Sequence, residues 1–457
     1  MKKFTKKILS IPVYTIYILL ITSNLLAGSV DYTSNQSAKY EVTFTRNATT
    51  DLSADIASFN PAGTAFLPQG LYFDISNQTL FMPYEESYTV QNTSKDEDVE
   101  QNKPIYFLPN IYAAYSFDQA GPGKLAAFAF LGVVAGGGSL DWKDGSLGSY
   151  IASQGIGFLA ATTRAVTSHS LEASSAYIHS TIGAAYSFLN NIVSASLSGR
   201  VMYAMKSLKL DAEYDTGSFT GEYDYNALGY SPVIGINIRP ATGLSIALRY
   251  EFETALEFKY EEKAFKPSDS DLRTAANTFL ASVKIQDGEK FNYNLPAMLA
   301  MGAEYALTPE LKLMMDVNLY FLSQADMGKV YYNGTAVDDL NEYFGTGYEI
   351  TFGATYMLLS DLRIGAGINY GVSGAKDKYF EDANTVLVCS ANPPLDSIAY
   401  ALGTTYIVDN NLDLTLACTW THFKSFKAEF NDSIYGDITA DYKKNIYVIA
   451  IGAGYRM

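Results

Sequence analysis

Three basic residues stand among small and apolar side chains in two alternating segments of the chain: Arg200, Lys206 and Arg249. Guanidinium and ammonium groups bind carboxylates through charge-assisted hydrogen bonds, and apolar walls beside them would hold a hydrocarbon tail. The two arginines could instead form ion pairs with Glu251 or Glu253, which is the commoner fate of charges inside a protein. The sequence therefore offers three candidate contacts for an amphiphilic anion, with an internal ion-pair network as the alternative.

The segments that carry these residues predict strands with two unlike faces, because apolar residues recur in them with a period of two. In 194–206 small and polar residues alternate with apolar ones, and 244–253, 311–321 and 412–422 repeat the pattern. One face is apolar enough for lipid and the other polar enough for a wet interior. A soluble barrel would reverse these faces, and alternation alone does not decide between the two.

Both ends of the chain favour a membrane barrel. Four lysines in the first seven residues, an apolar stretch at 8–21 and small residues up to Ser29 predict a signal peptide over residues 1–29. An uncleaved membrane anchor is the alternative, but the apolar stretch is shorter than the roughly 20 residues of a spanning helix. Residues 446–457 alternate to the last position, which predicts a closing strand typical of outer-membrane barrels.

Tight turns and long connections alternate along the rest of the chain. Clusters of Gly, Pro, Asn and Asp predict six tight turns, at 119–123, 190–191, 240–243, 308–310, 360–361 and 409–411. Seven longer polar connections lie between them, near 84–104, 139–174, 208–224, 258–289, 323–345, 375–395 and 425–441. Together they link about 14 strands. We therefore predict an all-β fold, a transmembrane antiparallel β-barrel of about 14 strands over residues 70–457.

Composition agrees with export to a membrane. Aromatic residues make up 14% of the chain, which suits the two aromatic girdles of a barrel. The net charge of −16 argues against nucleic acid as a partner. The sequence contains no metal-ligand spacing, so we expect no cofactor and no metal. The expected surroundings are outer-membrane lipid, lipopolysaccharide and the outer-membrane assembly machinery.

Residues 30–69 precede the first predicted strand and form a separate segment. The stretch 49–59 has helical character, and Asn60-Pro61-Ala62 ends it. A barrel of about 14 strands is wide enough to need filling if it is to be selective. We predict that this segment is an N-terminal hatch that plugs the lumen; a segment that hangs in the periplasm is the alternative.

At this point the chain resembles the FadL/TodX family of outer-membrane transporters for long-chain fatty acids and hydrocarbons. The resemblance lies in residues 53–67, Ser-Ala-Asp-Ile-Ala-Ser-Phe-Asn-Pro-Ala-Gly-Thr-Ala-Phe-Leu, where the family carries an Asn-Pro-Ala hatch motif. Residues 104–115 also resemble the family's second strand. The chain departs from the family at Met457, which replaces a terminal aromatic residue, although Tyr455 lies nearby.

The resemblance implies passive, diffusion-driven uptake by a monomeric barrel. A hydrophobic substrate would be caught by apolar extracellular loops, pass to a site in the lumen and leave through a gap where the third strand is kinked. An apolar path of this kind keeps such a molecule out of bulk water. Lys206 lies near the place where the family's fifth strand offers a basic residue to the substrate carboxylate.

Two further segments match that scheme. Residues 150–161 are unusually apolar for a loop, and Phe158 and Leu159 within them are candidate ligand contacts; inward packing as a loop core is the alternative. Three glycines end the predicted third strand and are candidates for the kink, with a plain strand end as the alternative: Gly136, Gly137 and Gly138.

Other functions stay open at this stage. Uptake of aromatic hydrocarbons would use the same architecture, and a general porin for polar solutes would need an open lumen. A hydrolase would need a serine nucleophile beside a histidine, and no such motif accompanies His169, His179 or His422. We therefore expect a transporter of hydrophobic molecules rather than an enzyme, with long-chain fatty acids as the first candidate substrate.

Overall fold

The computed structural model of the protein describes residues 36–134, 138–332, 334–382, 385, 390–432 and 435–457. The predicted signal peptide at 1–29 and the first residues of the predicted hatch lie outside this part of the chain. Within it, no helix is long and apolar enough to cross a membrane.

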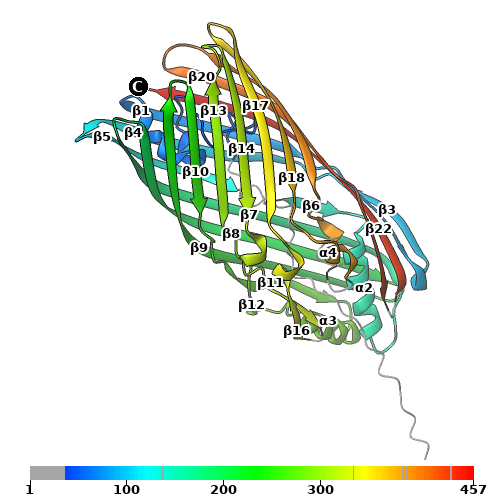
Figure 1. Ribbon diagram of the computed structural model, residues 1–457. Coiled ribbons are helices and arrows are strands. Elements are labelled where there is room, and N and C mark those ends of the chain that lie inside the picture. Colours follow the sequence, from blue (N-terminus) through cyan, green and yellow to red (C-terminus); the bar gives the residue numbers. More distant parts are fainter. Residues whose placement is uncertain (1–35, 135–137, 333, 383–384, 386–389, 433–434) are drawn as a thin grey trace, which may run out of the picture.

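Fourteen strands of the described residues form one closed antiparallel barrel (Figure 1), which confirms the predicted fold. Each strand pairs with the next, and the ring closes between the first and the last, where Tyr72 lies opposite Arg456. The barrel strands are β1 (Gly70–Phe81), β4 (Ile105–Ala120), β5 (Gly123–Val134), β7 (Val166–Phe188), β8 (Val193–Tyr214), β9 (Ser218–Ala241), β10 (Leu244–Glu251), β13 (Met298–Ala306), β14 (Leu311–Tyr320), β17 (Gly347–Leu359), β18 (Leu362–Val372), β19 (Ser397–Ile407), β20 (Leu412–Phe423) and β22 (Gly436–Arg456).

The two ends of the barrel differ. The six predicted tight turns and the C-terminus lie at one end, which we call the short-turn end (Figure 1). The opposite, long-loop end carries additional strands and helices: β2 (Tyr84–Val90), β3 (Lys95–Gln101), β6 (Ser139–Trp142), β11 (Glu257–Pro267), β12 (Lys290–Asn292), β15 (Lys329–Tyr332), β16 (Thr335–Asp339), β21 (Phe426–Asp432), α2 (Leu147–Leu159), α3 (Ser270–Ser282), α4 (Asp377–Glu381), and the 3-10 turns η3 (Gln91–Thr93), η4 (Leu322–Gln324) and η5 (Leu340–Tyr343).

These additional elements correct one expectation from the sequence. The longer polar connections contain regular elements: 84–104 and 425–441 form hairpins that prolong the barrel, 139–174, 258–289 and 375–395 include helices, and most of 208–224 simply continues β8 and β9. The error has a physical cause, because these strand extensions face water on their outer side. They therefore lack the apolar positions that mark the strands nearer the short-turn end.

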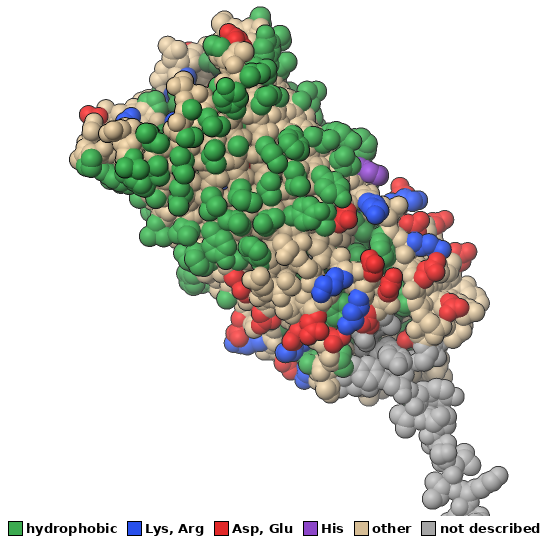
Figure 2. Space-filling view, in the orientation of Figure 1, with side chains coloured by type: hydrophobic (Ala, Val, Ile, Leu, Met, Phe, Trp, Pro, Cys, Tyr) green, Lys and Arg blue, Asp and Glu red, His purple; other side chains and the backbone are tan. Residues whose placement is uncertain are grey.

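Apolar side chains cover the outside of the barrel wall, as Figure 2 shows, whereas charged side chains gather at the long-loop end. Exposed aromatic rings follow the turns of the short-turn end: Phe73, Tyr115, Phe117, Tyr305, Tyr356, Tyr406 and Tyr455. A second group lies on barrel strands nearer the long-loop end: Tyr106, Phe107, Tyr203, Tyr230, Tyr370, Tyr400, Trp420 and Tyr447. Two aromatic girdles around an apolar belt are typical of a barrel in lipid and exclude the soluble barrel.

The described residues before β1 fill the lumen near the short-turn end, and we call residues 36–69 the hatch. Two short helical elements form its second half, α1 (Ile56–Phe59) and η2 (Pro61–Phe66), and nearly all of their side chains are buried. Ala54, Ile56 and Ala57 pack against aromatic residues of the wall, among them Tyr112 and Phe130. The hatch therefore lies inside the barrel rather than beside it.

Candidate functional site

The first site residue is Lys206, which β8 directs into the lumen. Its inward position follows from the alternation of β8, where even-numbered residues from Ser194 to Lys206 are buried. Lys206 is 4% exposed, and its Nζ has no hydrogen-bond partner in the described part of the chain. A buried ammonium without a partner is costly, so such a group points to a ligand.

Aromatic rings surround this ammonium. The Nζ atom lies 4.7 Å from the ring centre of Tyr293, 5.4 Å from that of Phe258 and 5.5 Å from that of Tyr177. Each distance is within the range of a cation–π interaction, which holds the ammonium without neutralising it. Tyr225 lies directly opposite Lys206 across the β8–β9 pair.

The rings around Lys206 continue into a cluster from β9, β11 and β12, which we call the aromatic shelf: Tyr225, Phe258, Tyr260 and Phe291. Phe258 and Phe291 stack with ring centres 5.4 Å apart, and Tyr260 lies 4.9 Å from Phe291. Strand pairing produces the cluster, because Tyr260 faces Tyr225 and Phe258 faces Phe291. A lone cation beside an apolar aromatic surface matches the two ends of a fatty acid.

The two predicted arginines lie in a different arrangement. Arg200 contacts one carboxylate oxygen of Glu251, and the Arg249 Nε lies 3.0 Å from the other. The ion-pair alternative from the sequence is therefore realised by Glu251. Glu253 instead accepts a hydrogen bond of 2.5 Å from the Asn294 side-chain amide. Whether either arginine contacts a ligand stays a prediction.

The Asn-Pro-Ala motif caps a hatch helix and joins it to the wall. The Asn60 Oδ1 accepts a hydrogen bond of 3.2 Å from Gly63 N, and Pro61 occupies the first position of η2. Both are regular helix-start features. The Asn60 Nδ2 donates to the Asn237 Oδ1 of β9 at 3.3 Å, and Ser194 Oγ donates to the Ala62 carbonyl at 2.7 Å.

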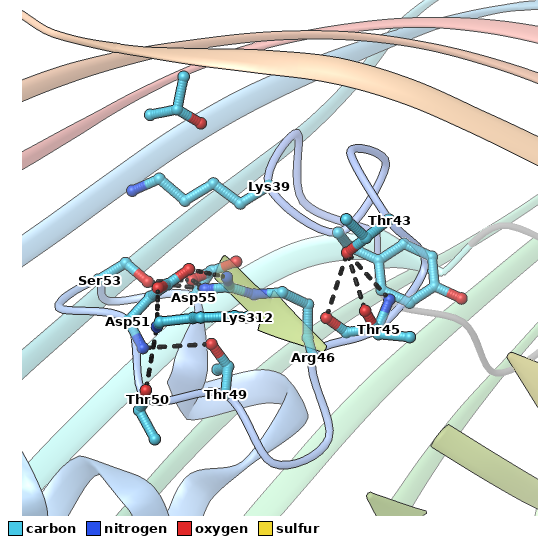
Figure 3. Close-up of polar contacts among 12 residues, drawn as sticks. Lys39, Thr43, Thr45, Arg46, Thr49, Thr50, Asp51, Ser53, Asp55 and Lys312 are labelled. Atoms are coloured by element: carbon cyan, nitrogen blue, oxygen red, sulfur yellow. Dashed lines mark hydrogen bonds and ion pairs between the residues drawn. The ribbon is translucent and has the colours of Figure 1, made fainter. Parts of the chain in front are cut away.

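The first half of the hatch is held by charge. Asp51 accepts contacts from Arg46 at 2.7 Å, Lys312 at 2.9 Å and Arg363 at 3.2 Å, and Figure 3 shows it meeting Arg46 and Lys312. Burial works against the charge of Asp51, but the surrounding cations outweigh burial and hold its pKa well below the usual range. Asp55 pairs with Arg46 at 2.5 Å in the same network.

The apolar segment at 150–161 is mostly a buried helix rather than an exposed loop. Helix α2 buries every residue from Leu147 to Gly157 in the long-loop mouth, so the expectation of an exposed apolar loop is corrected there. The segment folds inward because Ser146 starts the helix with a capping box and its small residues pack closely. Phe158 is 37% exposed and Leu159 is partly buried at the helix end; their contact with a ligand stays a prediction.

The same helix brings a serine beside a histidine. Ser149 Oγ lies 2.9 Å from His169 Nδ1, and both side chains are buried. The hydroxyl is also part of the capping box, in which it accepts a hydrogen bond of 2.7 Å from Ser146 N, and it donates to the Ser146 carbonyl at 2.9 Å. In this arrangement the serine hydroxyl serves the start of helix α2.

The wall is irregular where the third strand was predicted to kink. Val134 of β5 pairs with Tyr177 of β7, and Ser139 of β6 pairs with Ser174 of β7. The two pairing positions are five residues apart in the β5–β6 segment but only three residues apart in β7. Gly138 lies in that interval, while Gly136 and Gly137 lie outside the described residues. A mismatch of this kind bends a strand.

A seam accompanies this bend. The β4–β5 pairing ends at Asn110 and Gly132, whereas β4 continues to Ile105 with β1 as its described partner. A groove of about 690 Å³ in the wall reaches the flanks of the seam. Its lining contains outward-facing and lumen-side residues, including Phe107, Val133, Gly138, Ile178, Tyr203 and Lys206.

Residues 18–457 match the sequence profile of the family described as outer membrane protein transport protein (OMPP1/FadL/TodX). The chain belongs to this FadL/TodX family. Its localisation follows: it is a multi-pass protein of the outer membrane, with the short turns on the periplasmic side and the long loops outside the cell. No curated protein matches the chain in sequence.

Solved structures with the same fold are only distantly similar in sequence. A FadL homologue from Pseudomonas aeruginosa aligns with a TM-score of 0.68 at 11% identity, over 94% of this chain and 99% of that one. The toluene transporter TodX of P. putida gives 0.59 at 13% identity, over 92% and 99%. The toluene transporter TbuX of Ralstonia pickettii gives 0.55 at 13% identity, over 93% and 99%. These similarities concern the fold of this FadL/TodX protein.

Sequence reasoning found Lys206 but missed the rings around it. Tyr177 shares the inward face of β7, so its alternation was available as a signal. Phe258 lies in the predicted connection 258–289, and Tyr293 lies just after it. Neither residue stands in a segment whose alternation gives an apolar outer face. The shelf forms only when β11 and β12 pair above the belt.

Proposed function

We propose that this FadL/TodX protein takes up hydrophobic molecules by passive diffusion through its plugged barrel, with long-chain fatty acids as the first candidate substrate. The observation that carries the proposal is the buried Lys206 ammonium, which lacks a hydrogen-bond partner among the described residues and faces aromatic rings. A carboxylate would neutralise the ammonium, and the shelf at Phe258 and Phe291 would receive the hydrocarbon tail.

An aromatic hydrocarbon is the second candidate substrate. The aromatic shelf itself favours it, because offset and edge-on rings such as Tyr225 and Phe291, 5.7 Å apart, are the surroundings that a further ring prefers. TodX and TbuX are described as toluene transporters. An uncharged hydrocarbon would leave the Lys206 ammonium without a counter-charge, and for this reason we rank fatty acids first.

The seam between β4 and β6 supports a lateral exit to the membrane. Residues on its flanks, such as Phe107 and Val133, line a groove in the wall. A substrate that leaves there would enter lipid without crossing the charged network around Asp51 in the hatch. In this scheme Phe158 belongs to the first contact outside the cell.

Uptake by cells that lack their own hydrophobe transporter tests the proposal. Cells that express the wild type should accumulate labelled oleate above the empty-vector level, and Lys206→Met should remove most of that gain. Lys209→Met is the matched control, because Lys209 lies three residues further on β8 and pairs with Asp211 outside the lumen, at 2.6 Å.

Two other substrates separate the alternatives. Toluene uptake without oleate uptake would favour the hydrocarbon, with Lys206→Met then having no effect. Uptake of a small sugar without either hydrophobe would overturn the proposal in favour of a general porin.

A further inference from the structure

We propose that the hatch opens by halves: residues 38–55 stay fixed to the wall while residues 56–67 move and open a path along β4, β5, β7 and β8. This inference rests on the proposed function in that the plug borders the path of a substrate through the lumen. Its basis is the different way in which the wall holds each half. The two halves differ in charge, in closeness of contact and in the part of the wall they face.

Charge holds the first half. Lys39 pairs with Asp74 at 2.5 Å and with Asp413 at 2.9 Å, which ties it to β1 and β20. Asp51 pairs with Lys312 of β14 and Arg363 of β18. Breaking such buried pairs leaves an uncompensated charge, so these contacts resist separation.

Carboxylates of the wall also bind the backbone of the first half. The Asp316 Oδ2 accepts hydrogen bonds from Arg46 N at 2.8 Å and Asn47 N at 2.9 Å. Thr50 N donates to the Glu304 Oε1 at 3.2 Å. Hydrogen bonds to a charged acceptor are about twice as strong as neutral ones.

A patch of inward-facing glycines forms the surface under the first half. A Cβ at Gly353 would lie 2.6 Å from Thr45 Oγ1, one at Gly365 would lie 2.6 Å from a Val42 methyl group, and one at Gly403 would lie 2.8 Å from the other Val42 methyl group. The remaining members are Gly367, Gly452 and Gly454, against Thr43, Ala38 and Lys39. We call these six positions the glycine seat. Missing side chains let the hatch backbone lie directly on the strands.

The second half lacks these features. Residues 56–67 contain no charged side chain, so they form no side-chain ion pair. Ser194 donates to the Ala62 carbonyl, Ser116 donates to the Leu67 carbonyl, and Asn60 donates to Asn237, all as neutral hydrogen bonds. The one charged donor to its backbone among the described contacts is Arg249, at the Ser58 carbonyl, whereas the backbone of the first half meets carboxylates of the wall.

The second half also covers the side of the lumen that a substrate would need. Its apolar side chains, such as Ile56, pack on Tyr112, Phe128 and Phe130 of β4 and β5. Behind these rings lies His179 of β7, whose two ring nitrogens have no hydrogen-bond partner in the described residues. Displacement of residues 56–67 would free the lumen side of these rings for a substrate.

The opposite side offers a poor route for an apolar tail. A cavity of about 310 Å³ lies beside the first half and is lined largely by charged and hydroxyl side chains, among them Lys39, Arg46, Asp51, Lys312, Arg363 and Arg456. Moving a hydrocarbon past these groups would strip them of polar partners.

Two cross-links test the proposal in the full-length protein with Cys389 and Cys418 replaced by serine. Ala62→Cys with Ser194→Cys locks the second half to β8, and Val42→Cys with Gly403→Cys locks the first half to the glycine seat. Each pair is joined by a short bifunctional thiosulfonate, and the reduced form of the same variant is its control.

We expect the 62–194 lock to lower oleate uptake about tenfold and reduction to restore it, because a locked gate stops passage. The 42–403 lock should leave uptake within about twofold of its reduced form. Equal loss in both locks, or normal uptake with the 62–194 lock, would overturn the proposal.

Hydrogen exchange on the wild type tests the same proposal without a substrate. Protected amides in residues 56–67 should exchange about tenfold faster than those in 38–49, since exchange follows local opening. Uniform exchange would contradict opening by halves even if oleate uptake is normal. Faster exchange at 56–67 without any oleate uptake would instead count against the fatty-acid function and leave the hatch mechanism standing.

Discussion

Asp51 of the hatch and Lys312 of β14 are joined by an ion pair of 2.9 Å between Oδ1 and Nζ. Arg46 and Arg363 contact the same carboxylate, so the single Asp51 side chain forms ion pairs with three cations. This relationship makes Asp51 the centre of the contacts between the plug and the wall.

Replacing Asp51 should therefore loosen the hatch. Asp51→Asn leaves three partly buried cations without their shared carboxylate, at a cost of about 3 kcal/mol to hatch seating. We expect frequent channel openings in planar bilayers, where the wild type stays mostly closed. Lys329→Met is the control, because its pair with Asp339 is exposed at the long-loop end. An Asp51→Asn protein as closed as the wild type would contradict the role given to Asp51.

The hatch motif gives a second prediction. Asn60→Ala removes the helix cap at Gly63 and the contact with Asn237, which together should weaken hatch seating by about 1–2 kcal/mol. Asn237→Ala leaves the helix cap intact and should have the smaller effect on the hatch, although it also removes the hydrogen bonds of Asn237 to Ser245 and Ile246 within the wall. Proteolysis of the hatch in detergent measures both, and equal resistance of Asn60→Ala and wild type would refute this account of the motif.

The glycine seat gives a third prediction. Gly367→Val would place a side chain against the Thr43 carbonyl and should displace the first half of the hatch. Cells should become sensitive to a large antibiotic that the wild-type barrel excludes. Gly199→Val is the matched control, since a Cβ at Gly199 meets nothing within 4 Å. If both variants behave alike, close approach of hatch and wall is not what keeps the barrel closed.

Glu41 in the hatch predicts a pH dependence. Burial raises the pKa of Glu41 to about 8, and the Thr419 hydroxyl offsets only part of that rise. In the seated hatch the Glu41 carboxyl therefore keeps its proton up to about pH 8. In the released hatch the same carboxyl loses its proton above the ordinary pKa of 4.5. Stability of seating is fully present below that value and falls as pH rises toward 8.

Channel openings in planar bilayers should accordingly become more frequent between pH 5 and pH 8. Glu41→Gln should flatten this dependence, because the amide does not titrate. Asp51 has the opposite pH dependence, because its pKa is lowered in the seated hatch. Protonation of Asp51 weakens seating only in strong acid, below the ordinary pKa of 3.8. Openings that do not change with pH in the wild type would contradict a buried, protonated Glu41.

The barrel was predictable because lipid imposes one rule on every strand. Alternation in segments such as 194–206 and 412–422, with the tight turns and long connections between them, was sufficient for the strand number. The two ends of the chain then gave the inward direction of Lys206 and Arg200. The strands outside the membrane were not predictable in this way. Their outer faces are polar, so β11 and β12 looked like loops in the sequence.

The candidate site could be predicted only in part for a related reason. Parity placed Lys206 in the lumen once the two ends of the chain favoured a membrane barrel, but its neighbours depend on pairings between segments far apart, such as Tyr293 beside β8. The partner of Arg249 at Ser58 likewise depends on where the hatch lies within the lumen. No spacing along the chain encodes that contact.

Equilibrium binding to the purified protein tests the central claim most directly. Oleate and oleyl alcohol share a hydrocarbon chain and differ in the headgroup, so they isolate the carboxylate. The wild type should bind oleate about 10- to 100-fold more tightly than the alcohol, the range expected for a buried charge-assisted hydrogen bond. Lys206→Met should abolish that difference and leave the alcohol unaffected. Equal binding of both molecules by the wild type, or an oleate preference that survives Lys206→Met, would contradict a carboxylate site at Lys206.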